Sequence, residues 1–314
     1  MTTITEKSEL LFLYESKYSI PNGDPFTGEQ RYDEETKKVL VSDVRIKRFI
    51  RDYLHTQGQL IYVINSDADN KQTSGQRFKS LYEARANKNQ TPRDFAFSIL
   101  DVRLFGDVIA IQKDKAKKKG EKNDEDDASA FNVTGPVQFA LLNPSLNATD
   151  LRTHQNTSVF VSKEGDKQGT IGTATIVPFA LCQIHGWINP FSARLSGLTD
   201  DDVTEMLKAL WNSVNNVNTR SKSNQSSLLL LQIVYQNPTD KLYGVDKLIS
   251  LTAEKRDEEL RDLDDVTLNI ERLAQAAASP KVAEIRYYTE IDKIQEQLAA
   301  IGGKVRPLSL FDAA

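Results

Sequence analysis

The sequence of 314 residues has a single cysteine, Cys182, and only three histidines. One cysteine excludes an internal disulfide framework and is typical of a reducing compartment, so we expect a cytoplasmic protein. The histidines, His55, His154 and His185, are far apart and match neither an H-E-x-x-H nor an H-x-x-x-H spacing, so no common zinc site is predicted. Because Cys182 lies in an apolar strand pattern, we interpret it as a small buried hydrophobic residue.

Several motifs and segments that identify other protein classes are also missing. No G-x-x-x-x-G-K-[ST] or G-x-S-x-G motif occurs, and the glycines of "GTIGTA" are followed by no helix pattern, so we expect no phosphate-binding loop and no serine hydrolase. No apolar run approaches the roughly 18 residues that span a bilayer. The first residues, "MTTITEKSE", lack the basic and apolar regions of a secretory signal. We therefore expect no cofactor, no membrane and no enzyme chemistry.

The net charge of −4 is unevenly distributed along the chain. The segment 254–265, "EKRDEELRDLDD", has seven acidic and three basic residues, so it carries the whole net charge by itself. Residues 37–51 have six lysines and arginines against one aspartate, a local charge of +5. Local patches decide partner electrostatics more than the isoelectric point does, so nucleic acid stays a candidate partner.

The hydropathy pattern predicts an α+β fold in one domain, 1–314, with insertions. Stripped of the insertions, the order of elements is strand, helix, strand, strand, helix, strand, as in ferredoxin-like and RRM-like domains. Residues 113–130, "KDKAKKKGEKNDEDDASA", contain almost no apolar side chains, which predicts a mobile loop that is solvated or touches nucleic acid. The predicted elements are strands at 10–20, 60–64, 99–111 (interrupted at Gly106), 133–143, 173–189 and 226–236, helices at 43–55, within 75–98 and from Thr199, and a mainly helical segment at 252–314 with a possible strand "VAEIRYYT".

The stretch "NGDP", Asn22 to Pro25, poses a question. Asn-Gly favours a tight hairpin turn, but a polar loop and the basic segment "SDVRIKRFIRDYL" follow it in place of a returning strand. If Ser42 caps this helix, its apolar residues fall on one core-facing stripe, while Lys47, Arg48 and Arg51 lie on the flank. Such a cationic edge is either a solvated face or a contact for a phosphate backbone. The predicted stripe consists of Ile46, Phe49, Ile50, Tyr53 and Leu54.

Five blocks of sequence between residues 10 and 236 occur in an order found in a known family. They are "LLFLYESKYSIPNGDP", "VSDVRIKRFIRDYL", "DVRLFG", "TGPVQFA" and "RSKSNQSSLLLLQIVY". Together they resemble the backbone subunit of type I CRISPR Cascade complexes, a member of the RAMP superfamily, and most closely its subtype I-B branch. The segment beyond residue 240 adds little to this resemblance.

The resemblance implies a non-catalytic protein that binds CRISPR guide RNA (crRNA) and multimerises along it, supporting the pairing of the guide with a target DNA strand. Its implied partners are the guide, the target strand, further copies of itself and other Cascade subunits. An RRM-like palm would carry helical fingers at about 55–98 and a protruding thumb hairpin at 152–177. The Asn22–Gly23 turn would end the first palm strand at the RNA groove, where its backbone amides can form an anion-binding nest.

The resemblance also assigns residues to the RNA groove. Lys47, Arg48 and Arg51 would contact guide phosphates, and the loop "RSKSNQ" would line the same groove. "DVRLFG" and "TGPVQFA" would be palm strands, in which Gly106 and Gly135 permit close backbone approach. The residues of the "RSKSNQ" loop are Arg220, Lys222, Asn224 and Gln225, the fingers offer Arg77, Lys79, Arg85, Lys88 and Arg93, and the candidates to displace a base from the thumb are Val161 and Ile171.

Three alternatives remain at this level. Type III relatives cut target RNA with an aspartate in an early palm loop, for which Asp24, Asp33 or Asp43 are candidates, although a turn or a helix start also explains these residues. A protein-only scaffold of similar fold is the second alternative, and structural positions for Val161 and Ile171 are the third. The aromatic RRM motif K/R-G-F/Y-G/A-F-V-x-F/Y is absent, so base stacking on sheet aromatics is not expected.

Overall fold

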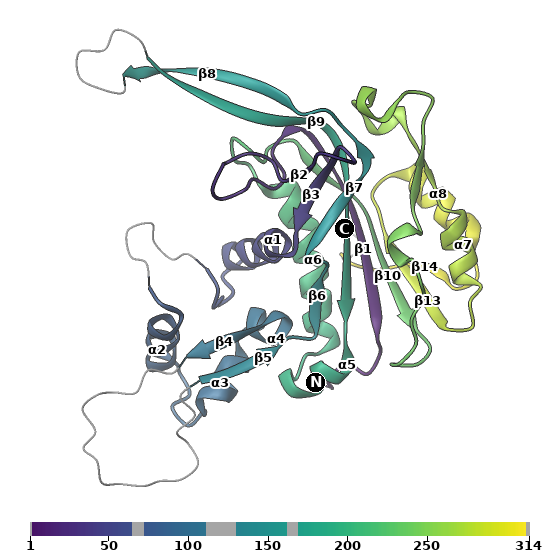
Figure 1. Ribbon diagram of the computed structural model, residues 1–314. Helices are drawn as coiled ribbons and strands as arrows, with labels where there is room; N and C mark the ends of the chain where they lie inside the picture. Colours follow the sequence, from purple (N-terminus) through teal and green to yellow (C-terminus); the bar gives the residue numbers. More distant parts are fainter. Residues whose placement is uncertain (1, 65–71, 111–129, 162–168, 312–314) are drawn as a thin grey trace.

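The computed structural model describes residues 2–64, 72–110, 130–161 and 169–311. A ten-stranded sheet forms the centre of the molecule, with its main path in the order β14-β13-β10-β1-β9-β7-β3-β2 and with β6 and β8 paired to β9 (Figure 1). The mixed α/β character that the sequence predicts is confirmed. The strands of this sheet are β1 (Ser8–Ser19), β2 (Tyr32–Asp33), β3 (Lys38–Ser42), β6 (Val137–Phe139), β7 (Leu142–Ala148), β8 (Arg152–Val161), β9 (Gly169–Ile188), β10 (Gln225–Tyr235), β13 (Val282–Tyr288) and β14 (Val305–Pro307).

The strand β1 lies between β10 and β9 and is antiparallel to both. Its side chains alternate between two apolar cores, as the period of a strand requires. Leu10 and Phe12 belong to the core on one face of the sheet, and Leu11 and Leu13 belong to the core on the other. The strands predicted at 10–20, 173–189 and 226–236 are therefore confirmed.

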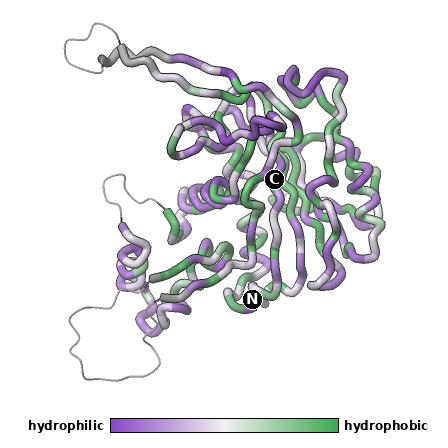
Figure 2. The backbone as a smooth tube through the Cα atoms, viewed as in Figure 1, coloured by the Kyte–Doolittle hydropathy of each residue, from purple (hydrophilic) through white to green (hydrophobic). Residues whose placement is uncertain are grey.

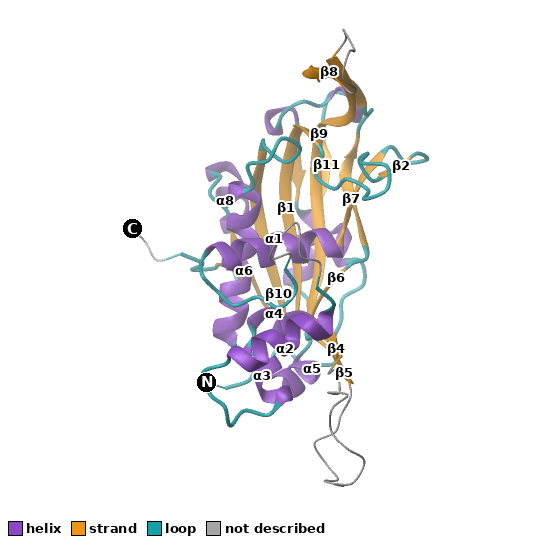
Figure 3. Ribbon diagram, turned by 90° about the vertical axis from the view of Figure 1, so that its left-hand side faces the viewer, coloured by secondary structure: helices purple, strands orange, loops and turns teal. Residues whose placement is uncertain are grey.

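Two helices, α1 (Asp43–Thr56) and α6 (Asp200–Asn216), cover one face of the sheet (Figure 3). Both have the expected N-caps, because the side chains of Ser42 and Thr199 accept backbone hydrogen bonds from the first helical turn. The predicted apolar stripe of α1 is buried at Ile46, Phe49, Ile50 and Leu54 and partly buried at Tyr53. A shorter helix, α5 (Pro190–Ser196), follows β9 directly.

The C-terminal segment covers the opposite face of the sheet (Figure 1). It is mixed and not mainly helical, because two of its strands extend the central sheet: β13 pairs with β10, and β14 pairs with β13. "VAEIRYYT" is the strand β13, as predicted. The remaining elements are η1 (Val245–Lys247), β11 (Ser250–Thr252), η2 (Asp257–Glu259), η3 (Leu263–Asp265), β12 (Thr267–Asn269), α7 (Glu271–Ala277) and α8 (Asp292–Ile301).

A smaller unit with its own apolar core stands beside α1. It comprises α2 (Ser74–Ala84), α3 (Pro92–Ser98), α4 (Leu100–Phe105) and the paired strands β4 (Gly106–Ala110) and β5 (Ala130–Thr134). Its core residues run from Tyr62 to Ile109, so the unit extends beyond the predicted end of the fingers at residue 98. Figure 2 shows this unit as a separate mixture of apolar and polar segments.

Three predicted strands need correction in and around this unit. "DVRLF" forms the helix α4 and not a strand, since its residues are buried between two cores and a continuous apolar run is compatible with either structure. Residues 60–64 are not a strand either: the amides of Tyr62 and Val63 donate to the carboxylate of Asp101 and not to a neighbouring strand. The strand predicted at 133–143 is divided among β5, β6 and β7.

Gly106 ends α4 with a φ of +71°, and a side chain there would meet the carbonyl oxygen of Val133 at 1.9 Å. A Cβ at Gly135 would lie 2.1 Å from the carbonyl carbon of Phe105, so the close backbone approach predicted at both glycines is real. This tight crossing joins the small unit to the sheet through β6.

The strand β8 and the first half of β9 form a long hairpin that projects from one end of the sheet (Figures 1 and 3). Its tip, 162–168, and most of the charged segment predicted at 113–130 lie outside the described residues. Among the residues that the structure describes, none of the helices combines the length and apolar character that a membrane crossing requires.

Candidate nucleic-acid interface

The stretch after β1 forms a wider loop than the tight turn predicted from Asn22–Gly23. Neither of these residues has a positive φ; Gly28, at +73°, does. Gly23 pairs with Gln30 in an isolated antiparallel bridge, so residues between them make the turn. The expected Asn-Gly hairpin turn is therefore wrong, because tertiary hydrogen bonds to Asn22 decide the local conformation.

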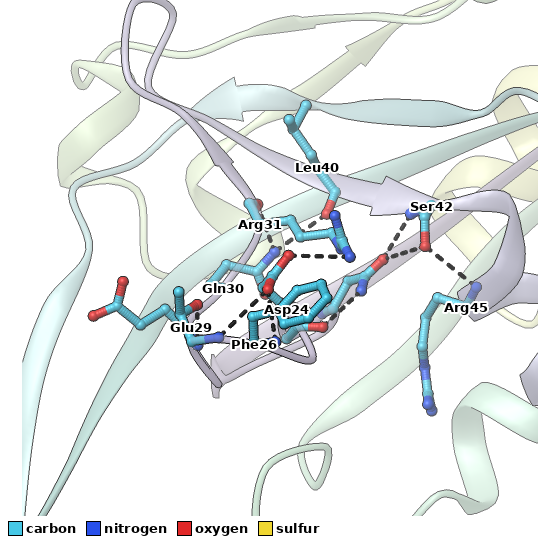
Figure 4. A network of polar contacts seen from close by, with 11 residues as sticks. Asp24, Phe26, Glu29, Gln30, Arg31, Leu40, Ser42 and Arg45 are labelled. Carbon is cyan, nitrogen blue, oxygen red and sulfur yellow. Dashed lines mark hydrogen bonds and ion pairs between the residues drawn. The ribbon is translucent and has the colours of Figure 1, made fainter.

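Asn22 is a structural link between this loop and helix α1. Its Oδ1 accepts hydrogen bonds from the backbone N and the hydroxyl of Ser42, at 2.7 and 2.8 Å, and its Nδ2 donates to the Gly23 carbonyl. The Ser42 hydroxyl in turn caps Arg45 at the start of α1 (Figure 4). The loop after β1 thus fixes where the basic helix begins, which explains why the turn leads into a helix.

The loop at 219–225 is held against the end of β1 on the other side. Ser221 accepts a hydrogen bond from the amide of Ile20 at 2.6 Å, and the carbonyl of Asn224 accepts from Lys17 at 3.0 Å. The Asn224 side chain donates back to the Lys17 carbonyl, and Asn224 itself has a φ of +66°. The family resemblance assigned this loop and the cations Lys47, Arg48 and Arg51 of α1 to one groove. The structure brings the loop and the start of α1 to the end of β1.

Three cations lie on the two segments attached to this strand end, Arg45 on α1 and Arg220 and Lys222 in the 219–225 loop; they are called the β1-end cluster below. In the described part of the chain, none of the three has an ion pair with a carboxylate. The Arg45 guanidinium lies over the Phe49 ring at 3.7 Å, and its buried Nε has no hydrogen-bond partner within the described ranges. Arg220 is exposed to solvent.

Burial shifts the electrostatics of two members of this cluster. Burial, together with the nearby charge of Arg45, lowers the pKa of Lys222 to about 8. Burial likewise lowers the pKa of Arg45 to about 10. Among the described residues, the Lys222 ammonium contacts only neutral oxygens, the Ile20 carbonyl at 3.4 Å and the Ser221 hydroxyl at 3.3 Å. The charge of Asp52 acts on Arg45 without a direct ion pair, so these two close cations remain a site that an anion would stabilise.

Two of the predicted RNA contacts on α1 are engaged inside the protein. Arg51 donates through Nε to the carboxylate of Asp101 at 3.0 Å, and this carboxylate is completely buried. Lys47 donates to Gln138 at 2.9 Å and lies 3.4 Å from Asp43. Both cations lie over the Phe105 ring. These two side chains brace α1 against the small unit.

The other predicted residues have varied surroundings. Arg48 is half-exposed and forms an ion pair with Asp52 on the same helix. Gln225 is buried and donates to the Lys222 carbonyl, while its Oε1 has no partner in the described residues. Val161 and Ile171 lie on β8 and β9, their side chains lie outside the described set, and their base-displacing role stays a prediction. The cations predicted for the fingers contact neighbouring groups. Backbone carbonyls accept hydrogen bonds from Arg77, Arg85 and Lys88. The Lys79 ammonium lies 3.9 Å from the Glu83 carboxylate, and the Arg93 guanidinium lies over the Phe97 ring.

The three early aspartates hold the local backbone. Asp24 accepts from the amides of Phe26 and Thr27 and pairs with Arg31, and these amide hydrogen bonds lower its pKa. Asp33 accepts from the amides and hydroxyl of its own turn. Asp43 pairs with Lys47. In the described residues no group of three acidic, histidine or cysteine side chains could hold a metal ion.

Sequence reasoning missed the role of Arg45. It counted Arg45 in the local charge of the basic segment but assigned it no contact, because the residue adjoins the apolar stripe of α1. The helix period does place it 40° from Phe49, where a guanidinium can stack on the ring while its charge stays near the strand end. Cys182, by contrast, is fully buried as predicted, and burial raises its pKa to about 12.

Comparison with known proteins now identifies the family. The model of the family "CRISPR-associated protein Cas7" matches residues 6–271. A CRISPR-associated protein Cas7 from Haloferax volcanii is 27% identical over 287 residues, which cover 88% of this chain and 83% of that protein. A chain of a CRISPR RNA-guided surveillance complex has a similar fold, with a TM-score of 0.52, 16% identity and coverage of 98% of this chain and 95% of the other. A chain of such a complex in a pre-nicking state has a TM-score of 0.50 at 13% identity, with coverage of 98% and 96%. The chain belongs to the CRISPR-associated Cas7 family.

Proposed function

We propose that this protein is a non-catalytic backbone subunit that binds CRISPR guide RNA in a surveillance complex. The observation that carries the proposal is the β1-end cluster: Arg45 and Lys222 lie close enough for one charge to lower the pKa of the other, and Arg220 is exposed in the same loop as Lys222. None of the three forms an ion pair with a carboxylate among the described residues. A phosphate backbone requires charge and hydrogen-bond donors at such a place and carries no sequence information. Family membership supports the same function.

The fold supports a division into palm, fingers and thumb. The elements β1, α1, β6, β9, α6 and β10 follow the order strand, helix, strand, strand, helix, strand, with β10-β1-β9 adjacent and both helices on one face. This arrangement is the RRM-like palm. The unit built from α2 to β5 serves as the fingers, and the β8–β9 hairpin serves as the thumb (Figure 1).

The partners follow from this assignment. The subunit binds one guide together with further copies of itself and other Cascade subunits, and the guide pairs with a target DNA strand. Base pairing reads the sequence in such complexes, while the protein holds the backbone. We assign the complex to a type I system of subtype I-B on the strength of the five sequence blocks, and to the cytoplasm because a single cysteine suits a reducing compartment.

The cluster predicts how affinity depends on salt. Replacing Arg45, Arg220 and Lys222 by glutamine should weaken binding to a single-stranded RNA and flatten the slope of log K against log[salt] by about two units, since each neutralised phosphate contributes about 0.7. The matched control replaces Arg272, Lys281 and Lys293, three exposed cations of the C-terminal segment, and should leave the slope unchanged. An equal slope in both triple variants would exclude the cluster as the phosphate site.

The competing function, RNA cleavage by an early-loop aspartate, has a separate test. Purified complexes are incubated with magnesium and an RNA complementary to the guide. We expect the RNA to remain intact, because Asp24 and Asp33 already accept hydrogen bonds from their own turns. Cleavage that is lost on Asp24→Asn, Asp33→Asn or Asp43→Asn substitution would contradict the non-catalytic assignment.

A further inference from the structure

Tyr18, at the end of β1, has an unusual backbone and an exposed ring. Its φ is +44°, in the left-handed region that residues other than glycine and asparagine rarely adopt. Its side chain is 60% exposed, although the strand before it is buried on both faces. An aromatic residue in this conformation persists only where the surrounding structure imposes it, and such residues are concentrated at functional sites.

The neighbours on both sides impose this conformation. The amide of Lys17 is bonded to Asn224 and the amide of Ile20 to Ser221, so the 219–225 loop fixes the chain before and after Tyr18. The ladder between β1 and β9 pairs Lys17 with Phe179 and Ser19 with Val177. Tyr18 lies between these pairs, opposite Pro178, which has no amide to donate.

The strained residue turns an aromatic ring away from the core. Alternation along β1 would place residue 18 on the face of Phe12 and Tyr14, whose rings are buried in the core beneath α1 and α6. These sheet aromatics are therefore inaccessible to a nucleobase. The left-handed φ instead leaves Tyr18 exposed at the strand end, where the loop that carries Arg220 and Lys222 is attached.

We propose that the Tyr18 ring is a stacking platform for one base of the single-stranded RNA whose phosphates bind the β1-end cluster. The inference rests on the proposed RNA-binding function and adds a base contact to it. Every base has an aromatic face, so stacking is tolerant of sequence and is compatible with any guide. A cationic groove with an adjacent aromatic ring is the combination that single-stranded nucleic acid requires.

The test uses the full-length protein and a fluorescent single-stranded RNA of about six nucleotides, within the site size of one binding module. Tyr18→Ala should weaken binding about 10- to 100-fold, as loss of one stacked base does. Tyr18→Phe should bind like the wild type, and Tyr18→Leu, which keeps apolar bulk without an aromatic face, should resemble Tyr18→Ala. The salt slope should stay unchanged in all three variants, because no phosphate contact is lost.

Two further measurements separate the contribution of base stacking from other contributions to RNA affinity. An RNA with abasic positions throughout should bind the wild type and Tyr18→Ala equally well, since it offers nothing to stack. An RNA with 2-aminopurine at successive positions should show fluorescence quenching at one position with the wild type, a readout independent of any variant. The matched control is Tyr243→Ala: this tyrosine is 95% exposed on the C-terminal segment and should not contribute.

The outcomes separate this inference from the proposed function. Unchanged affinity in Tyr18→Ala, with a flattened salt slope in the cluster variant, would overturn the stacking platform and keep RNA binding. A Tyr18→Ala effect confined to RNAs long enough for several copies would identify a protein contact and also overturn it. Absence of RNA binding by the wild type would overturn the proposed function itself.

Discussion

At the scale of single residues, the ion pair of Arg51 with Asp101 links α1 to the small unit, and a substitution of Arg51 tests how much it stabilises the fold. Asp101 is completely buried and accepts hydrogen bonds from Arg51 and from the amides of Tyr62 and Val63. Arg51→Glu would place a second negative charge beside this carboxylate, so we expect a loss of about 3–5 kcal/mol in the free energy of unfolding, measured by urea denaturation.

Arg48→Glu is the matched control, because the Arg48–Asp52 pair is exposed on the same helix and exposed pairs contribute at most about 1 kcal/mol. Similar small losses in both variants would contradict the bracing role of Arg51. A charge reversal of Lys47, Arg48 and Arg51 together is therefore a poor test of RNA binding, since it damages the fold before it reaches any RNA contact.

Lys222 predicts a pH dependence of RNA affinity. Its pKa in the folded protein is about 8, below the usual 10.5 of a lysine, so the free protein loses this charge as the pH rises through 8. We expect the affinity for single-stranded RNA to fall between pH 7 and pH 9. Lys222→Arg should bind equally well at both values, because arginine stays protonated. An equally flat profile for the wild type would remove Lys222 from the phosphate site.

The same shift affects stability in the opposite direction. Between pH 8 and pH 10.5 the unfolded chain keeps the proton on Lys222 and the folded protein does not, so this residue makes the free energy of unfolding rise with pH in that window. Affinity and stability should therefore diverge above pH 8, which distinguishes loss of one charge from general unfolding.

The sequence predicted the apolar stripe of α1 and its Ser42 cap because both depend on local spacing. It could not separate free cations from engaged ones. The partners of Arg51 and Lys47 are Asp101 and Gln138, which lie 50 and 91 positions further along the chain. Helix geometry gives the direction of a side chain, and only the tertiary fold brings in the group that it meets.

At the scale of elements, strands with a clear local pattern were predicted, and those that depend on tertiary contacts were not. β1, β9 and β10 are long runs with strand-forming residues and were predicted. α4 has only six residues, nearly all buried, so no helical period could distinguish it from a strand. In the C-terminal segment, β13 was predicted, whereas the three-residue strand β14 depends on pairing with β13, which local propensity does not reveal.

The pairing of β4 with β5 predicts that the segment between them can be replaced by a short turn. Ala110 at the end of β4 pairs with Ala130 at the start of β5, so the chain leaves and re-enters at neighbouring positions. Replacing residues 112–128 by a two-residue Asn-Gly turn should preserve the pair and leave the melting temperature nearly unchanged. The RNA affinity of this variant shows whether the lysines of the replaced segment contribute. A large fall in melting temperature would mean that the segment supports the core of the small unit.

At the scale of the whole molecule, the sheet joins every part that the proposed function uses. β1 ends at the cationic cluster, β9 continues from the sheet into the projecting hairpin, and β6 connects the sheet to the small unit through the crossing at Gly106 and Gly135. A long antiparallel sheet with cores on both faces is rigid, so it holds these parts at fixed separations. Fixed separations are what a repeating assembly on one RNA requires.

The last prediction concerns how copies are joined along the guide. Twelve residues of β9, from Val177 to Ile188, bury most of their side chains in the sheet, while the described side chains of β8 from Arg152 to Gln155 are exposed. A hairpin rooted this firmly can reach a neighbouring copy without support from its own core. Shortening its tip, residues 164–168, to Gly-Gly should therefore leave the melting temperature and the affinity for a six-nucleotide RNA unchanged.

Cooperative growth on a long guide should be lost, because each copy would no longer hold its neighbour. The measurement is the size of complexes on a guide long enough for several subunits, by light scattering or negative-stain imaging. The control is the Asn-Gly variant of residues 112–128, which shortens the connection between β4 and β5 and should still form long assemblies. Assemblies of wild-type length from the shortened hairpin would show that contacts elsewhere, and not this hairpin, join the copies.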